Sequence, residues 1–509
     1  MSDDVKKAFL DFREATDRFY KKELTVKEYK GISGGYGSYA QKGGECSMIR
    51  LRLAGGLITK DKLSFIVDCI NKYKINMVHL TTCQAVQLHN ISGEAACDIA
   101  EKAMDHGIIT LGGGGDNPRN ITASPLSGIE KNEYYDVLPY AQAAEDYLMS
   151  IRTSIKLPRK LKVGFSNSPE NITHATFRDL GFVANLDGTF DVYSAGGLGK
   201  DPCMGLCVCK GVSPSQVLYH IRAMVKMFTM YGNYEDRSKA RTRYMQETLG
   251  VEDYIKKYTE MIYESLSEGG LDLKVEERAV IKKGNGVTKG PRIYEQKQSG
   301  LYYVVYHPIG GDPKASKFED IYNVIKDMDD VEIRVSPDET MYIVNCNAKE
   351  AEAVFAVTND GARTLFESSV SCVGNTICQI GLRDSHGLLL SLVKMSRKND
   401  FADGVLPRIH ISGCISSCGS HQIGVIGFQG ASGRKNGIVV PAFNMFIDGS
   451  HFQNRERFGD SVGVFAESDI VDMLEEIGKT VTKSGKDFKS WFTNDRGTFT
   501  IIVGKYVLS

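Results

Sequence analysis

The chain has 509 residues, of which 42% are hydrophobic and 25% are charged, values typical of globular proteins. Its 62 Lys and Arg residues almost balance its 63 Asp and Glu residues, which excludes a globally basic nucleic-acid-binding protein and an acidic disordered tail. Residues 1–15 lack the apolar core of a signal peptide, and no apolar run is long enough to span a membrane. We therefore expect a cytoplasmic protein that binds neither nucleic acid nor membranes.

The N-terminal part of the chain predicts a short succession of helices and strands. Residues 1–45 are expected to form a helix and an arm, with the Gly-rich segment 31–39 as a linker. Residues 46–115 then predict a strand, a Gly-Gly turn, a helix over 60–74, two strands and a helix over 93–106. This is the pattern of a small α+β unit.

The same order of elements returns in the second half of the chain. Residues 291–358 predict a strand, a Gly-Gly turn, a helix over 317–328, two strands and a helix over 348–357. Further along each copy, residues 157–166 (LPRKLKVGFS) match residues 406–414 (LPRIHISGC). Leu-Gly-Phe at 180–182 and Ile-Gly-Phe at 426–428 then follow at corresponding places. Chance similarity is the alternative, but it does not explain so many landmarks in one order.

We therefore predict an α+β fold with a two-fold internal repeat, each copy being a small α+β unit followed by a larger α/β unit. A polar segment at 271–300 separates the copies and follows a helical region at 213–267. The predicted divisions are the N-terminal helix and arm (1–45), the first small unit (46–115), the first larger unit (116–290), the second small unit (291–358) and the second larger unit (359–509).

Twelve cysteines in a chain with no secretion signal favour metal binding or catalysis over disulfides. Cys372 and Cys378 form a C-x5-C pair, and Cys414 and Cys418 form a C-x3-C pair. Four thiolates on two Gly-containing loops can hold one [4Fe-4S] cluster. Zinc is the alternative metal, but C-x5-C is longer than most zinc-binding spacings. Buried thiols without a metal are the remaining alternative.

A second group of thiols consists of Cys203, Cys207 and Cys209 in a Gly-rich segment. They predict either a further metal site, with Cys46 or Cys97 as a fourth ligand, or ordinary small side chains in a packed region. In a strand, Cys207 and Cys209 would point to the same face.

The pairing of C-x5-C with C-x3-C, the latter within ISGCISSCGSHQIGVIGF, resembles the sirohaem and [4Fe-4S] sulfite and nitrite reductases. The resemblance covers about residues 20–495 and includes the segments NPRNITASPLSGI, LPRKLK, ITHATFRDLGFVA and RSKARTRY. It implies two ferredoxin-like half-domains, each followed by an α/β sirohaem domain. It also implies that the four cysteines ligate the cluster and that Cys418 bridges it to the sirohaem iron. Ile415 stands where the family usually has Pro.

The resemblance further implies which residues hold the sirohaem. A buried polycarboxylate needs cationic partners, and Arg grips carboxylates bidentately. Without the resemblance, the run RSKARTRY would be interpreted as a solvated basic face. With it, the predicted cofactor-binding residues are Cys418, Arg159, Arg241, Arg243, Asn117 and Gln84, with Arg237 nearby.

The same comparison implies that Arg119, Lys160 and Lys162 act in catalysis. Cationic side chains over the open face of the iron can bind a small anion and deliver protons to its oxygen atoms. Lys162 favours sulfite, because many nitrite enzymes have Asn at that position. A second cation also benefits a doubly charged anion more.

Cys83 departs from the family pattern. The family segment usually reads Thr-Thr-Arg-Gln, with the Arg facing the substrate, whereas here it is Thr81-Thr82-Cys83-Gln84. One interpretation is weaker sulfite binding, and another is a different substrate. A third is that Cys83 reacts with the macrocycle or the substrate. The simplest alternative is an inert buried thiol.

The sequence thus predicts an enzyme that reduces sulfite to sulfide with six electrons, using sirohaem and a [4Fe-4S] cluster. No dinucleotide-binding fingerprint in a βαβ context is present, so we expect an external electron donor such as ferredoxin or a separate reductase subunit. The alternatives are reduction of nitrite to ammonia, an electron-transfer or sensing protein that binds the cofactors without turnover, and a zinc-stabilised structural protein.

Overall fold

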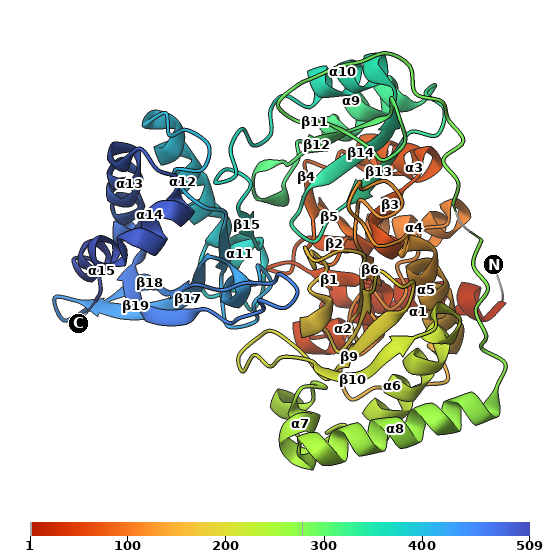
Figure 1. Cartoon of the computed structure of the whole chain (residues 1–509). Coiled ribbons are helices and arrows are strands. Elements are labelled where there is room, and N and C mark those ends of the chain that lie inside the picture. Colours follow the sequence, from red (N-terminus) through yellow and green to blue (C-terminus); the bar gives the residue numbers. More distant parts are fainter. Residues whose placement is uncertain (1–2, 277, 509) are drawn as a thin grey trace. The chain divides into compact units, whose positions relative to one another are not determined.

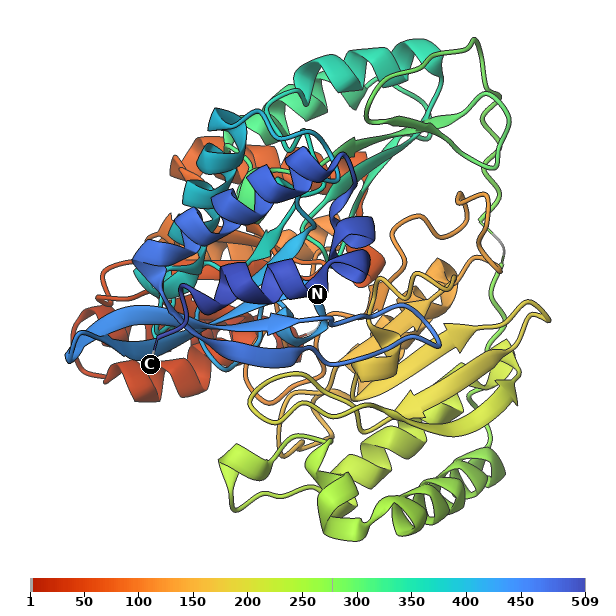
Figure 2. The same cartoon turned by 60° about the vertical axis from the view of Figure 1, so that its left-hand side comes forward.

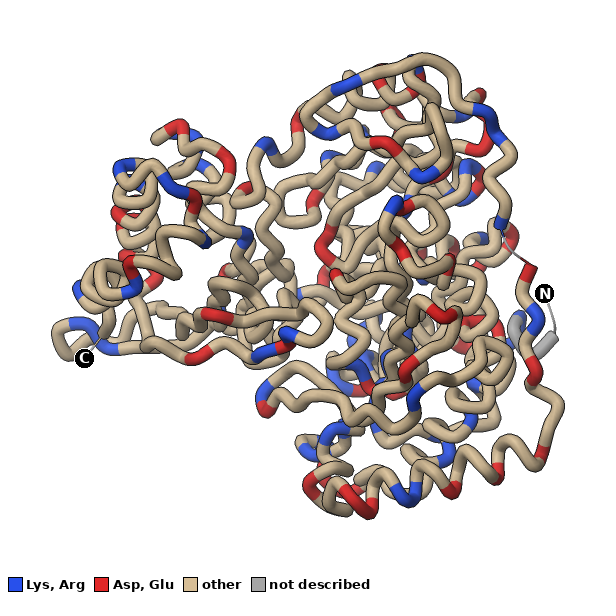
Figure 3. The backbone as a smooth tube through the Cα atoms, viewed as in Figure 1, with Lys and Arg blue, Asp and Glu red and all other residues tan. Residues whose placement is uncertain are grey.

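The computed structural model describes residues 3–276 and 278–508. It divides into two compact units (Figure 1). Unit 1 consists of Met1–Gly197, Cys203–Tyr306 and Pro313–Asn359, and unit 2 consists of Leu198–Pro202, His307–Asp312 and Asp360–Ser509. Acidic and basic residues are interspersed along both units (Figure 3). Among the described residues, no helix is both long and apolar enough to cross a membrane.

The first small sheet is antiparallel and has the strand order β1-β2-β5-β4. Its strands are β1 (Ser38–Ala40), β2 (Ser47–Leu51), β4 (Met77–Leu80) and β5 (Val86–Ile91). Helices α3 (Lys60–Tyr73) and α4 (Gly93–Ala103) begin where sequence predicts, because Thr59 and Ser92 cap their first backbone amides.

The second small sheet has the order β11-β12-β14-β13-β3. Its strands are β3 (Leu57–Ile58), β11 (Ile293–Glu295), β12 (Tyr302–Tyr306), β13 (Glu332–Val335) and β14 (Met341–Cys346), and its helices are α9 (Ser316–Ile325) and α10 (Ala348–Val357). Strand β3 comes from the first copy and pairs with β13 through Ile58 and Ile333. One hydrophobic core therefore spans both small copies.

The Gly-Gly turns of the two small copies adopt the same backbone conformation. Gly55 has φ 61° in η2 (Ala54–Gly56), and Gly310 has φ 62° in η7 (Ile309–Gly311). Both values lie in the left-handed region, which a side chain disfavours. This agreement, together with the matching order of elements, confirms the internal repeat.

The two larger sheets also share one topology. The first runs β6 (Thr122–Ala123), β7 (Val163–Ser166), β8 (Leu180–Ala184), β9 (Phe190–Ser194) and β10 (Leu206–Val212). The second runs β15 (Val370–Ser371), β16 (Ile409–Ser412), β17 (Ile426–Lys435), β18 (Ile438–Ile447) and β19 (Asp460–Ala466). In each, the first three strands are parallel and the last two pairings are antiparallel.

The strand register corrects the predicted alignment of these two copies. Val163 pairs with Leu180, and Ile409 pairs with Ile426. Gly181 and Gly427 each pack against a backbone carbonyl oxygen. A Cβ atom at either position would lie only about 2 Å from that oxygen, so both positions require Gly. Val163 and Ile409 are therefore equivalent, so the match of LPRK with LPRI is out of register by three residues.

Helices cover the larger sheets and complete their cores. In the first copy they are α5 (Leu138–Ile151), α6 (Val217–Tyr231), α7 (Tyr244–Leu249) and α8 (Val251–Glu268). Helices α6 and α8 lie side by side along the yellow strands (Figure 2). In the second copy they are α11 (Gly374–Ile377), α12 (Ser385–Lys398), α13 (Glu467–Ser484), α14 (Phe488–Asn494) and α15 (Arg496–Gly504).

The N-terminal segment differs from the predicted arm. It forms α1 (Asp3–Tyr20) and α2 (Val26–Ser33), and the expected linker continues through η1 (Gly34–Tyr36) into β1. A capping box between Thr25 and Glu28 starts α2. Tyr29 of this helix stacks on Phe19 with ring centroids 4.3 Å apart. Side-chain packing therefore orders this segment, although its many glycines suggested a flexible linker.

The predicted α+β fold class with a repeated half-domain is confirmed. Apart from β1 and β3, each of the segments 46–115, 116–290, 291–358 and 359–509 contributes the strands of one sheet, and β1 lies within residues 1–45. The exact domain boundaries between these segments remain a proposal.

Candidate active site

Arg119 lies on a segment that joins the first small copy to the first larger sheet. Its backbone amide donates to the Leu161 carbonyl (2.8 Å), and its guanidinium donates to the carbonyls of Gly113 (2.8 Å) and Gly115 (2.9 Å). Its buried Nε has no hydrogen-bond partner among the described residues. Burial lowers the pKa of Arg119 to about 10. The side chain is thus held in place with donor capacity left for an anion.

Lys160 and Lys162 flank the buried Leu161 at the entrance to β7. Because successive side chains of an extended chain alternate, the two lysines project to the face opposite Leu161. The Lys162 amide donates to the carboxylate of Asp179 (2.8 Å). Bonds between this segment and residues 117 and 119 place both lysines beside Arg119.

Cys83 lies in the turn between β4 and β5, within the same group of cations. The Asn120 side chain donates to the Cys83 carbonyl (2.7 Å), which ties the turn to the residue after Arg119. Burial alone would raise the pKa of Cys83. The positive charges of Lys162, Arg178, Arg50 and Lys160 together lower it to about 6.

Three members of this group were missed by sequence reasoning: Arg50, Arg178 and Tyr39. Arg50 on β2 donates to the Gly113 carbonyl (2.5 Å), as Arg119 also does. Burial raises the pKa of Tyr39, but Arg119 and Arg50 outweigh it and lower the pKa below its usual value. The only sequence feature that could have indicated Arg50 is its charged side chain on a mostly apolar strand. Arg50 thus adds a further cation beside Cys83.

The residues predicted to hold sirohaem form a second group of cations in unit 1. Arg159 and Arg237 both pair with Asp116 (3.0 and 2.7 Å), and Arg241 pairs with the buried Asp179 (2.9 Å). Arg243 is 7% exposed and lies over the Tyr244 ring (4.6 Å). The Nε atoms of Arg241 and Arg243 are buried without partners among the described residues. Such a group fits a polycarboxylate macrocycle.

Asn117 and Gln84 have different surroundings. Asn117 donates to the Gly114 carbonyl (3.1 Å) beside the Arg119 guanidinium. Gln84 is fully buried, and its amide nitrogen donates to the carbonyls of Ala123 (2.8 Å) and Val335 (2.7 Å). Its amide oxygen accepts from the Ala123 amide (2.8 Å). These contacts favour a structural role for Gln84 over the predicted contact with the cofactor.

The four cysteines predicted to bind the cluster all belong to unit 2. Strands β15 and β16 are parallel, with Ser371 opposite Ile411, so Cys372 and Cys414 follow them at the same edge. The Cys372 sulfur lies 3.2 Å from the Gly413 amide, which donates to it, and 3.1 Å from the Ser385 hydroxyl. Cys378 ends α11, and Cys418 is exposed on the following loop. Soft thiolate donors and approaching amides fit a [4Fe-4S] cluster.

Among the described residues, no three His, Cys, Asp or Glu side chains converge in a ready metal-binding geometry. This applies to the four cysteines of unit 2 and equally to Cys203, Cys207 and Cys209. Burial raises the pKa values of the latter three thiols. Cys209 packs against the core of the first larger sheet, as the alternative without a metal expects.

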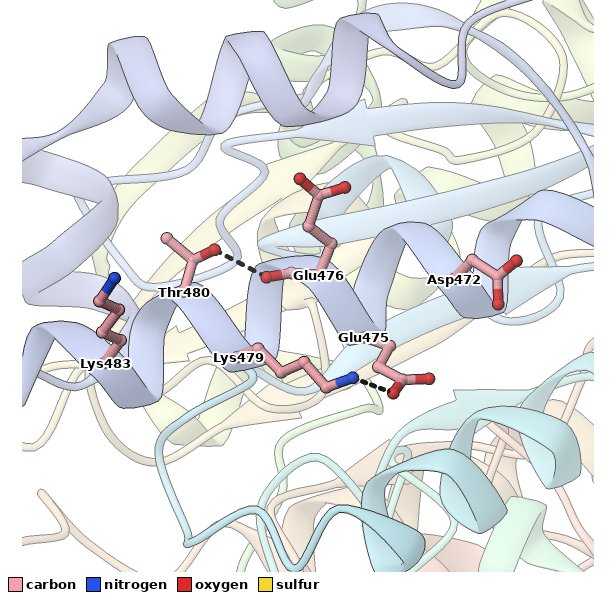
Figure 4. Close-up of a pocket in the computed structure, with 6 residues that line it drawn as sticks. All are labelled: Asp472, Glu475, Glu476, Lys479, Thr480 and Lys483. Atoms are coloured by element: carbon pink, nitrogen blue, oxygen red, sulfur yellow. Dashed lines mark hydrogen bonds and ion pairs between the residues drawn. The ribbon is translucent and has the colours of Figure 1, made fainter.

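The depression drawn in Figure 4 lies elsewhere, on α13 of unit 2. Its lining residues all come from this one helix, and they include the ion pair of Lys479 with Glu475 (2.5 Å). Glu476 pairs with Lys505. These side chains neutralise one another on an exposed face, so the depression has no part in the chemistry described above.

Two family models match the first copy of the repeat. Residues 39–106 match the nitrite/sulfite reductase ferredoxin-like half domain, and residues 114–266 match the nitrite and sulphite reductase 4Fe-4S domain. The structure of the Mycobacterium tuberculosis NirA protein has the same fold, with a TM-score of 0.79 at 21% identity over 96% of this chain and 95% of that one.

Similar proteins of known name cover most of the chain. The ferredoxin–nitrite reductase of Synechococcus elongatus is 25% identical over 450 residues, covering 84% of this chain and 85% of that protein. The assimilatory ferredoxin-dependent nitrite reductase of Haloferax mediterranei is 24% identical, covering 81% and 76%. The chain belongs to the sirohaem and [4Fe-4S] nitrite and sulfite reductase family of oxidoreductases, and these two groups are its cofactors.

Proposed function

We propose that this enzyme reduces nitrite to ammonia with six electrons supplied by ferredoxin. The observation that carries the proposal is the likeness, over more than three quarters of the chain, to proteins named ferredoxin-dependent nitrite reductases. The sequence alone favoured sulfite because of Lys162. The relatives therefore support the alternative better than that first prediction.

We assign substrate binding to Arg119, Lys160 and Lys162 in unit 1. Nitrite is a small anion, and fixed guanidinium and ammonium donors can bind both of its oxygen atoms. Each oxygen leaves as water after accepting two protons, and the ammonium groups of Lys160 and Lys162 can supply protons there. When bound, sirohaem would supply the iron and the electrons for this reduction.

We assign cluster binding to Cys372, Cys378, Cys414 and Cys418 in unit 2. Arg159, Arg241 and Arg243 would pair with the carboxylates of the macrocycle, and Asn117 would hold the segment beside them. In this assignment, unit 1 binds the anions and unit 2 binds the [4Fe-4S] cluster.

Sulfite remains the second candidate, because one observation favours it. Lys160 and Lys162 project to the same face beside Arg119, which concentrates positive charge where a doubly charged anion gains most. Reduction of sulfite to sulfide takes the same number of electrons.

The test uses the purified enzyme with both cofactors and reduced ferredoxin, under anaerobic conditions. The proposal expects one ammonium released for each nitrite consumed, with a kcat/KM for nitrite at least about tenfold above that for sulfite. A higher kcat/KM for sulfite would replace it with the second candidate. Binding of both cofactors without turnover of either anion would support an electron-transfer or sensing role instead.

A further inference from the structure

The backbone of Cys83 is held in place among the cations proposed to bind the substrate. Its carbonyl accepts from the Asn120 side chain (2.7 Å), and the next residue, Gln84, is locked by its bonds to Ala123 and Val335. The Thr81 carbonyl accepts from the Gln84 amide (2.8 Å), which closes the turn. These bonds hold the backbone on both sides of Cys83 in place.

Positive charges face this thiol from four separate segments. They are Arg50 from β2, Arg119 from the segment before β6, Lys160 and Lys162 from the entrance to β7, and Arg178 from between η4 and β8. Arg178 is only 9% exposed, and its Nε donates to the Thr173 carbonyl (2.8 Å). Together these cations favour an anion in their neighbourhood.

Two other groups near these cations can carry negative charge. The Tyr39 hydroxyl accepts from the Gly115 amide (2.8 Å). Asp179, beside Arg178, is occupied by Arg241, Thr242 and the Lys162 amide. The pKa of Cys83 lies near 6, so at neutral pH its sulfur is an anion inside the anion-binding group.

We propose that Cys83 sets the charge selectivity of the site, because its thiolate weakens the binding of a doubly charged anion more than that of a singly charged one. The energy of repulsion scales with the product of the charges, so sulfite dianion is repelled about twice as strongly as nitrite. Even with screening as strong as in water, the second charge of sulfite at a separation of about 3 Å changes the relative affinity roughly tenfold. The inference rests on the proposed function and explains how a lysine-rich site can favour nitrite.

The first test measures equilibrium binding of nitrite and sulfite to the oxidised enzyme with both cofactors, followed by the absorption bands of sirohaem. Cys83→Ser keeps the size of the side chain but cannot ionise at these pH values. Near pH 8, the variant should lower the ratio of the sulfite Kd to the nitrite Kd by about tenfold. Near pH 5, sulfite is largely singly charged and the thiol neutral, so the two proteins should have the same ratio.

Cys207→Ser is the matched control, because Cys207 is also a half-buried thiol of unit 1 but its pKa is raised by burial. It should leave the ratio unchanged at both pH values. An equal ratio in wild type and Cys83→Ser near pH 8 would overturn the inference.

The second test measures alkylation of individual cysteines by iodoacetamide, with peptide mass spectrometry on the full enzyme. The alkylation rate at Cys83 should reach half of its maximum near pH 6. The alkylation rate at Cys207 should still be increasing at pH values above the pKa of an ordinary thiol, because burial raises the pKa of Cys207. A Cys83 rate that rises only with that of Cys207 would also overturn the inference.

The two proposals fail separately in these experiments. If nitrite is reduced but Cys83→Ser leaves the ratio unchanged, the selectivity inference is overturned and the proposed function stands. If the ratio shifts as expected but neither anion is reduced, the proposed function fails and the electrostatic role of Cys83 is supported, since binding and alkylation need no turnover.

Discussion

The two larger sheets are built alike but carry different side chains at equivalent positions. Because Val163 is equivalent to Ile409, Lys162 of the first copy is equivalent to Arg408 of the second, and Ser168 is equivalent to Cys414. In the parallel pairing of β6 with β7 and of β15 with β16, Ser124 corresponds to Cys372. The first copy thus has hydroxyls where the second has thiols.

The loops that follow β7 and β16 share their backbone conformation as well. Asn171 and Ser417 have positive φ values of 45° and 54°, and His174 and Ser420 have values of 55° and 57°. A 3-10 helix follows in each copy, η4 (Ala175–Phe177) and η8 (His421–Ile423). One scaffold thus carries different side chains at its strand ends, and we propose that they serve anion binding in unit 1 and thiolate ligation in unit 2.

The largest effect is expected from removing a thiol of unit 2. Cys414→Ser takes away one soft ligand at the edge that β15 and β16 share, so the cluster should be lost and activity should fall by about a thousandfold or more. Iron content and visible absorption measure this directly. The matched control is Ser168→Ala at the equivalent position of the first copy, which should retain all of its iron. Full iron content in Cys414→Ser would contradict the assignment of the cluster to unit 2.

The next largest effect should come from Arg119. Replacing it with Gln removes a fixed cation while leaving the backbone bond to Leu161 in place. We expect kcat/KM for nitrite to fall by about a hundredfold or more, as for other fixed donors that stabilise an anionic substrate. The absorption bands of the cluster should be unaltered. A variant with near wild-type kinetics would show that Arg50 or the lysines bind the anion without it.

Asp179 should have a smaller effect on both stability and binding. Its buried carboxylate accepts from the Lys162 amide, Arg241 and Thr242. Asp179→Asn leaves Arg241 without its ion-pair partner, which costs about 3 kcal/mol of unfolding free energy where such a pair is buried. KM for nitrite should rise about tenfold, with kcat less affected, because Lys162 is displaced. Asp179→Glu should recover part of the KM. A loss of kcat alone would contradict a positioning role.

The smallest effect is expected from Lys162→Asn, which sharpens the comparison of substrates. Removing one cation should lower kcat/KM for sulfite by about tenfold and for nitrite by less, since the doubly charged anion loses more. The control is Arg408→Asn at the equivalent position of the second copy, where the side chain instead bonds the Ser368 hydroxyl. Equal losses for the two anions in Lys162→Asn would rule out charge selection at this position.

Much of the fold could be predicted from hydrophobic periodicity and turn signals. The helix at 348–357 matches α10 at both ends, because Asn347 and Glu350 form a capping box there. The transfer of β3 to the second small sheet could not be predicted, since two-residue strands leave no periodic pattern. The order imposed on α2 depends on ring stacking between Tyr29 and Phe19, which is tertiary.

The candidate site was predictable in part, for similar reasons. Arg119, Lys160 and Lys162 stand in recognisable segments, and the structure brings them together through backbone bonds. Arg50 and Arg178 come from distant segments, and only folding places them near Cys83. Gln84 was predicted to bind the cofactor, but its buried amide instead bonds to three backbone segments. The sequence does not distinguish these two roles.

The central claim is that the cations of unit 1 serve nitrite reduction. The most direct measurement supplies equal concentrations of nitrite and sulfite to the enzyme with both cofactors and reduced ferredoxin, and quantifies ammonium and sulfide. We expect ammonium to exceed sulfide by at least about tenfold near pH 8, with the excess reduced in Cys83→Ser. Sulfide as the major product would contradict it.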